Sequence, residues 1–145
     1  CIKVSKLKSN YTILLNHNLV IEFHSGILTA LNYIEFKKKL LNDSLFKADL
    51  NHLIDFKNVK FNTNPTDISD FVDFLKSRTQ FLGNRKVAFV TNTPNQVVST
   101  TIYKLTQGNL NQEVEIFSTE ENALKWLNIP NSVIKDVLKI INKLK

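Results

Sequence analysis

Apolar and polar residues along this chain alternate in short runs and then recur every three to four positions, the pattern of strands followed by helices. Two strand-like runs, at 11–16 and 19–24, are separated by a short polar turn, so they predict a hairpin that ends at Ser25-Gly26. Later apolar runs each pass through a polar turn into a stretch with helical spacing. These later strands are predicted at 52–57, 86–92 and 114–117.

Capping residues indicate where the helices begin. Thr93, with Pro94 at the first helical position and Gln96 at the third, forms a capping box. Ser118 and Glu121 form a second one. The four helices are therefore expected to begin at Thr29, Thr66, Thr93 and Ser118.

The order of the elements predicts the fold class. It is β-β-α-β-α-β-α-β-α, followed by one more helix at 130–145. Strands that alternate with helices form a sheet with helices packed on it. We therefore expect an α/β protein with a single mixed, largely parallel sheet of about five strands. Residues 1–128 are interpreted as the domain and 129–145 as an added basic amphipathic helix.

Charge, apolar run length and cysteine content exclude several classes of protein. The formal net charge is +6, but residues 9–129 hold 12 basic and 12 acidic groups, so the excess lies at the two ends and argues against a nucleic-acid binder. The longest uncharged apolar-rich stretch, 11–21, is far shorter than the roughly 20 residues of a membrane span. A single cysteine, Cys1, excludes a disulfide framework and suits a reducing cytoplasm, and no signal peptide is visible.

Catalytic and metal-binding signatures are missing from the sequence. His17, His24 and His52 have no metal-ligand spacing, so they are interpreted as structural or exposed side chains. Three glycines in the whole chain leave no glycine-rich loop for a phosphate. We expect no cofactor, no metal and no enzymatic activity.

Polar side chains are concentrated in the two turns that connect the predicted strands 52–57 and 86–92 to the helices that follow them. If these strands are parallel neighbours, both turns lie at one edge of the sheet, where helix N–H groups could hold an anion, although plain capping also explains them. Asp55 is either a buried carboxylate with a raised pKa or a strand-end residue that accepts hydrogen bonds from the following loop. The candidate surface for a partner or ligand is Asp55, Lys57, Thr63, Asn64, Thr66, Thr93, Asn95 and Gln96.

The C-terminal helix has an apolar stripe flanked by Lys135, Lys139 and Lys143. A helix of this kind lies on an anionic membrane surface, or covers an apolar face of its own domain or of a second copy. The absence of aromatic residues in the helix favours packing over membrane insertion.

Several short segments resemble bacterial SpoIIAA-like proteins of the STAS-like group, which is related to lipid-binding CRAL-TRIO (Sec14-type) domains. The resemblance covers about residues 10–128, and its most telling part is Ala123-x-x-Trp126-Leu127. The segments that carry it are 19–22, 25–29, 53–56, 86–90, 93–97 and 117–127.

The resemblance implies a mixed sheet with helices on it and a domain that acts without catalysis. In the anti-sigma-factor antagonists of this group, a kinase phosphorylates a serine in an Asp-Ser-Ser-Gly-type turn and thereby breaks partner binding. The corresponding turn here, 61–67, has neither serine nor glycine, so Thr63 and Thr66 are the candidate switch positions. The expected function is binding of a protein partner or small ligand by a cytoplasmic monomer or homodimer. The alternative is a lipid- or membrane-surface-binding module.

Overall fold

The sheet contains five strands in the same order as in the sequence, β1-β2-β3-β4-β5. The computed structural model describes residues 6–78, 80, 83–108 and 110–145. The strands are β1 (Leu7–Leu14), β2 (Leu19–Leu28), β3 (Asn51–Phe61), β4 (Arg85–Val90) and β5 (Gln112–Phe117). The α-helices are α1 (Ala30–Leu41), α2 (Pro65–Lys76), α3 (Pro94–Thr106), α4 (Glu120–Trp126) and α5 (Asn131–Leu144), and a 3₁₀ turn, η1 (Leu15–His17), joins the first two strands.

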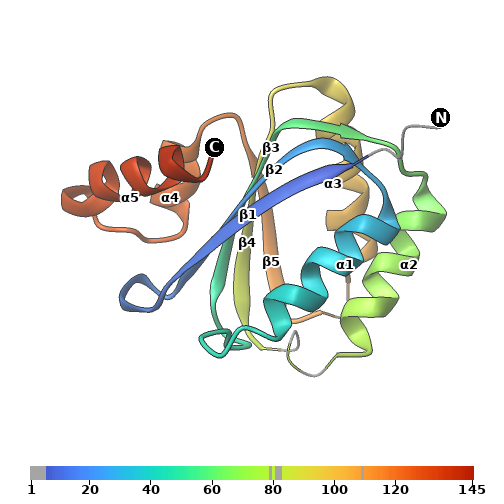
Figure 1. Ribbon diagram of the computed structural model, residues 1–145, viewed down its shortest axis with the longest axis horizontal. Helices are drawn as coiled ribbons and strands as arrows, with labels where there is room; N and C mark the ends of the chain where they lie inside the picture. Colours follow the sequence, from blue (N-terminus) through green and yellow to red (C-terminus); the bar gives the residue numbers. More distant parts are fainter. Residues whose placement is uncertain (1–5, 79, 81–82, 109) are drawn as a thin grey trace.

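Strand directions confirm the expected mixed, largely parallel sheet. β1 pairs antiparallel with β2, and β2 to β5 are parallel to one another. Each connection from β2 to β5 leads to the next strand of the sheet, always in the same direction. Because connections between parallel strands are right-handed, α1, α2 and α3 lie on the same face of the sheet. α4 follows the last strand and is free of this constraint. It lies with α5 on the opposite face (Figure 1).

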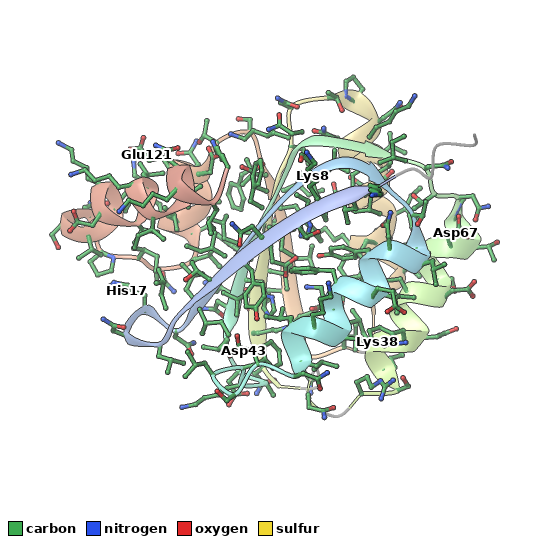
Figure 2. All side chains as sticks on the ribbon, in the orientation of Figure 1. Lys8, His17, Lys38, Asp43, Asp67 and Glu121 are labelled. Atoms are coloured by element: carbon green, nitrogen blue, oxygen red, sulfur yellow. The ribbon has the colours of Figure 1, made fainter. Side chains whose placement is uncertain are left out.

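The sheet therefore separates two apolar cores. The core under α1–α3 is rich in aromatic residues, among them Tyr33, Phe56 and Phe89. The core under α4 and α5 is aliphatic. Figure 2 shows Glu121 of α4 on one side of the sheet, and Lys38 and Asp67 of α1 and α2 on the other.

The hairpin and the third strand are longer than expected. β2 continues through Ser25-Gly26, which we expected to end it, because the register shifts between Phe23 and Ser25 and the pairing with β3 then resumes. Gly26 has a φ of 101°, and a Cβ there would collide with the Lys6 carbonyl, so only glycine fits. The glycine thus marks an irregularity inside a strand.

Two helix starts differ from the prediction by one or two residues. Thr93 caps α3 as expected, but α2 is capped by Asn64, whose side chain accepts the Asp67 amide, and not by Thr66. Pro65 suits the first helical position, which leaves the preceding asparagine as the cap. Thr119, and not Ser118, caps α4.

α5 packs on its own domain. Ile134, Val137 and Ile141 are buried in the aliphatic core, together with Ile21 and Leu53 of the sheet. Lys135, Lys139 and Lys143 are exposed on the same helix. Among the described residues, no helix is both long and apolar enough to span a membrane.

Candidate functional site

The polar turns after β3 and β4 meet, as expected for parallel neighbours. A surface groove of about 320 Å³ lies between the first turns of α2 and α3. Thr63, Asn64 and Asn95 of the predicted surface line this groove. We call it the α2–α3 groove; its other lining residues are Phe61, Pro65, Ile68, Val98, Ser99 and Ile102.

Gln96 has a structural role, because its side chain is buried, with only 2 % of the residue exposed. Its Oε1 accepts the backbone amides of Asn92 and Thr93, and its Nε2 donates to the carbonyls of Lys57 and Val59. Gln96 therefore fixes the start of α3 to β3. The Thr93 hydroxyl accepts the backbone amide of Gln96, so both residues hold the first turn of α3, which lines the groove.

Asp55 and Lys57 lie away from the α2–α3 groove, on the opposite face of the sheet, beside Glu120 at the start of α4. Asp55 is 1 % exposed, and its Oδ1 accepts the Lys57 amide. The Lys57 ammonium donates to Glu120 Oε1 and lies 3.9 Å from Asp55 Oδ2. Lys145 Nζ reaches the same glutamate oxygen at 3.4 Å. We call these four residues the Asp55 cluster.

The two carboxyl groups of the Asp55 cluster, Asp55 and Glu120, have very different pKa values. Burial, with the Glu120 carboxylate beside it, raises the pKa of Asp55 to about 6, despite the amide and ammonium of Lys57. Burial is the largest single effect on Glu120 and acts to raise its pKa. The hydrogen bonds from Lys57, from the backbone amide and from Asp55, with the charge of Lys57, together outweigh burial and lower the pKa to about 2. Asp55 is thus a buried carboxyl with a raised pKa, one of the two interpretations that the sequence left open.

The Asp55→Asn substitution should stabilise the protein more at pH 8 than at pH 4.5. The folded pKa of Asp55, about 6, lies above its ordinary value of 3.8, so its stabilising contribution is full below pH 3.8 and is lost as the pH rises through 6. Asparagine can still accept the Lys57 amide and does not titrate. We expect the difference in unfolding free energy between variant and wild type to grow by about 2 kcal/mol from pH 4.5 to pH 8, as measured by urea unfolding.

The exposed Asp70 of α2 provides a matched control, because Asp70→Asn makes the same chemical change outside the cluster. The difference in unfolding free energy between Asp70→Asn and the wild type should be the same at pH 4.5 and at pH 8. An Asp55→Asn difference that does not change with pH would show that Asp55 is ionised throughout this range.

A second polar cluster, which was not predicted from the sequence, lies beneath α1. Glu22 of β2 is fully buried; its Oε1 accepts His24 Nε2 at 2.8 Å and the Tyr33 hydroxyl at 2.9 Å. Its Oε2 accepts Lys37 Nζ at 2.6 Å and lies 3.5 Å from His52 Nδ1. We call these five residues the Glu22 cluster.

The charges of the Glu22 cluster depend on one another. Burial alone raises the pKa of Glu22, but the Lys37 ammonium, the hydrogen bond from His24 and the nearby His52 ring together outweigh it and hold the pKa well below the usual range. Burial lowers the pKa of Lys37, and it lowers that of His52 to about 3, so His52 is neutral. One ionised glutamate thus organises the polar groups under α1.

A weak signal for this cluster existed in the sequence. Glu22 and His24 alternate with apolar residues, a pattern typical of a strand with one face in water. β2 is instead an inner strand covered on both faces, so its polar side chains need buried partners. Lys37 of α1 supplies one of these partners.

The apolar pocket under α1–α3 is small. An apolar cavity of about 50 Å³ lies among Tyr33, Phe56, Phe71 and Phe89. Small-molecule sites usually measure about 300–1,000 Å³. Among the described residues, no three His, Cys, Asp or Glu side chains are grouped so that they could hold a metal ion.

These features define a mixed α/β domain with a surface groove at the edge where its parallel strands end. A family model described as SpoIIAA-like matches residues 19–128, so the chain belongs to the SpoIIAA-like family. This membership supports a binding or regulatory domain.

A solved structure agrees on the fold. An uncharacterised protein of the DUF3478 family from Shewanella loihica PV-4, described as having a SpoIIAA-like fold, is similar with a TM-score of 0.58. The match covers 88 % of this chain and 98 % of that protein, at 15 % sequence identity, so it shows the fold alone. A comparison with curated proteins found no match.

Proposed function

We propose that this protein is a cytoplasmic binding domain that recognises a protein partner non-covalently through the α2–α3 groove. The observation that carries the proposal is an exposed apolar stripe on α3 beside the groove. Val98 is 56 % exposed and Leu105 is 78 % exposed, and Ile102 lies between them at helical spacing. Exposed apolar residues that are grouped on one surface favour an interaction site.

The shape of the surface favours a protein over a small molecule. The groove is open to solvent, and the apolar pocket that adjoins it holds only about 50 Å³. A partner could place one or two apolar side chains against Val98 and Ile102. The polar rim, Asn64 and Asn95, would then supply hydrogen bonds around this apolar centre, the usual anatomy of a protein interface.

Thr66 is the better placed of the two candidate switch residues. Its side chain is exposed on the first turn of α2, whereas the Thr63 hydroxyl oxygen is buried at the groove wall. A phosphate on Thr66 would add about two negative charges beside the groove. It would weaken the docking of an apolar segment there, so the proposed regulation acts through Thr66.

The Val98→Glu substitution should remove partner binding. A carboxylate in the centre of an apolar contact must lose its water without gaining a partner, which costs several kcal/mol. We expect at least a tenfold drop in the partner captured from a lysate of the native host by the tagged full chain, as measured by quantitative mass spectrometry.

Leu31→Glu is the matched control, because Leu31 is an exposed leucine on α1 that does not line the groove. Its capture profile should equal that of the wild type. Equal losses in both variants, or no loss in Val98→Glu, would place the recognition surface elsewhere.

A second candidate function, binding to a membrane surface, is favoured by the exposed Lys135, Lys139 and Lys143 on α5. Lysines near anionic lipid contribute about 1 kcal/mol each. The apolar side of α5 is packed in the protein core, so this attraction would be purely electrostatic. Flotation of the full chain with anionic vesicles, compared with a variant in which the three lysines are glutamines, tests this candidate separately from the groove.

A further inference from the structure

Three side chains of the β1–β2 hairpin form a hydrogen-bonded chain that ends at the protein surface. Ser9 Oγ lies 2.7 Å from His24 Nδ1, and His24 Nε2 lies 2.8 Å from Glu22 Oε1. Ser9 and His24 are directly opposite each other in the antiparallel pair, and Glu22 lies two residues from His24 on the same strand face. The order serine–histidine–carboxylate is that of a serine hydrolase triad.

The direction of each hydrogen bond follows from the charge of Glu22. Its carboxyl group has a pKa well below the usual range, so it is ionised and can only accept. His24 Nε2 must therefore carry the proton of the 2.8 Å bond. In a neutral imidazole, Nδ1 is then an acceptor, and the Ser9 hydroxyl donates to it. The two ring nitrogens exchange the roles that they have in the serine proteases.

The surroundings hold the histidine in this orientation. The ring of Phe36 meets the His24 ring edge-on, with centroids 4.6 Å apart, and Tyr33 does so at 5.2 Å. Lys37 holds the second oxygen of Glu22, which fixes the carboxylate. A base whose position is set by packing and by further hydrogen bonds needs no rearrangement before it accepts a proton.

Only the serine end of this chain meets solvent. Ser9 is exposed on the edge strand β1, whereas His24 and Glu22 are fully buried. Ser9 lines an open groove of about 430 Å³ between β1 and α1. The other residues of this β1–α1 groove include the apolar or aromatic Leu7, Tyr11 and Phe36, and the cationic Lys39.

We propose that Ser9 is an activated nucleophile that accepts acyl groups from small esters in the β1–α1 groove. This activity goes beyond partner recognition at the α2–α3 groove, and it uses His24, which the sequence pattern indicated to be a structural or exposed side chain. Ser9 Oγ attacks the ester carbonyl carbon while its proton passes to His24 Nδ1. The adduct expels the leaving oxygen, which takes this proton and departs as an alcohol, and the acyl group remains on Ser9.

Water completes the cycle by the same route. It gives a proton to His24 Nδ1 and attacks the acyl carbon, and the proton then returns to Ser9 Oγ as the carboxylic acid leaves. Glu22 remains ionised throughout and stabilises the imidazolium that forms in each half. Leu7, Tyr11 and Phe36 in the groove suit a short acyl chain.

The first test compares two serines within the wild-type full chain. The protein is treated with an alkyl fluorophosphonate, which reacts with activated serines, and the modified peptides are followed over time by mass spectrometry. Ser44, which is exposed in the connection between α1 and β3, serves as the internal reference. General-base assistance predicts that Ser9 reacts at least about 10²-fold faster than Ser44. Equal rates at the two serines would overturn the proposal without any substitution.

Variants then test each role. Ser9→Ala should remove the fast labelling and the hydrolysis of p-nitrophenyl acetate, whereas Ser44→Ala should leave both unchanged. His24→Asn should reduce labelling of Ser9 to the rate of Ser44, with folding checked by circular dichroism. Labelling of Ser9 that stays fast in a folded His24→Asn protein would show that His24 is not the base. Val98→Glu should label like the wild type, which separates this activity from the proposed partner binding.

Discussion

The Glu22→Gln substitution is expected to lower the free energy of unfolding by about 3–5 kcal/mol, the cost of leaving one partner of a buried ion pair alone. Lys37 Nζ would lose the carboxylate that it contacts at 2.6 Å while remaining almost fully buried. His24 and Tyr33 would also face an amide in place of an ionised acceptor. Urea unfolding at neutral pH measures this effect.

Two further variants separate charge from packing. Glu35→Gln makes the same change at an exposed glutamate of α1 and should alter stability by less than about 0.5 kcal/mol. A Glu22→Gln/Lys37→Met double variant should recover part of the loss, because it leaves no buried charge without a partner. A double variant as unstable as Glu22→Gln alone would show that the ion pair is not the source of the effect.

Low pH should weaken the same ion pair between Glu22 and Lys37. The folded pKa of Glu22 lies well below its ordinary value of 4.5, so the stability from its ionised form is present above pH 4.5. This stability is lost as the pH falls through the lower folded value. The acid limb of the stability curve of Glu22→Gln should accordingly be flatter than that of the wild type.

Removing the C-terminal helix should unfold the protein. A chain that ends at Asn128 lacks Ile134, Val137 and Ile141, which are all buried in the aliphatic core. Burial of each such side chain stabilises a protein by about 1.5–3 kcal/mol, or about 5–9 kcal/mol for the three. Small domains have a total stability of about 5–15 kcal/mol. We expect no cooperative thermal transition in circular dichroism.

The control keeps the helix and changes only its charge. The variant with glutamine at positions 135, 139 and 143 retains the buried side of α5 and should unfold within about 0.5 kcal/mol of the wild type. A truncated chain with a wild-type transition would instead mean that 129–145 is an independent appendage, as the sequence analysis divided it.

The order of the strands and helices was readable from the sequence because it depends on local patterns. Apolar spacing predicted each of the α-helices α1 to α5, and the Thr93–Gln96 capping box predicted the start of α3. The exact start of a helix was less certain where two residues that suit the cap position lie close together. Asn64 and Thr66 are both good caps, and only the preference of Pro65 for the first helical position separates them.

The candidate surface was only partly predictable, because a strand places alternate side chains on opposite faces. Asn64 and Asn95 do line one groove, as their position after parallel neighbours indicates. Asp55 and Lys57 precede the same turn in the sequence, yet their side chains lie on the other face, beside Glu120. Which face a strand residue occupies depends on where the helices pack, and this lies outside the local pattern.

The sequence by itself determined the α/β class, the order of the elements and the capping of α3, since each depends on residues near one another in the chain. The tertiary structure alone decided that β2 is covered on both faces, that Lys37 meets Glu22, and that Ser9 meets His24. The last two contacts join residues 15 positions apart. Their chemistry arises because strand pairing and helix packing bring groups together at the distances where hydrogen bonds form.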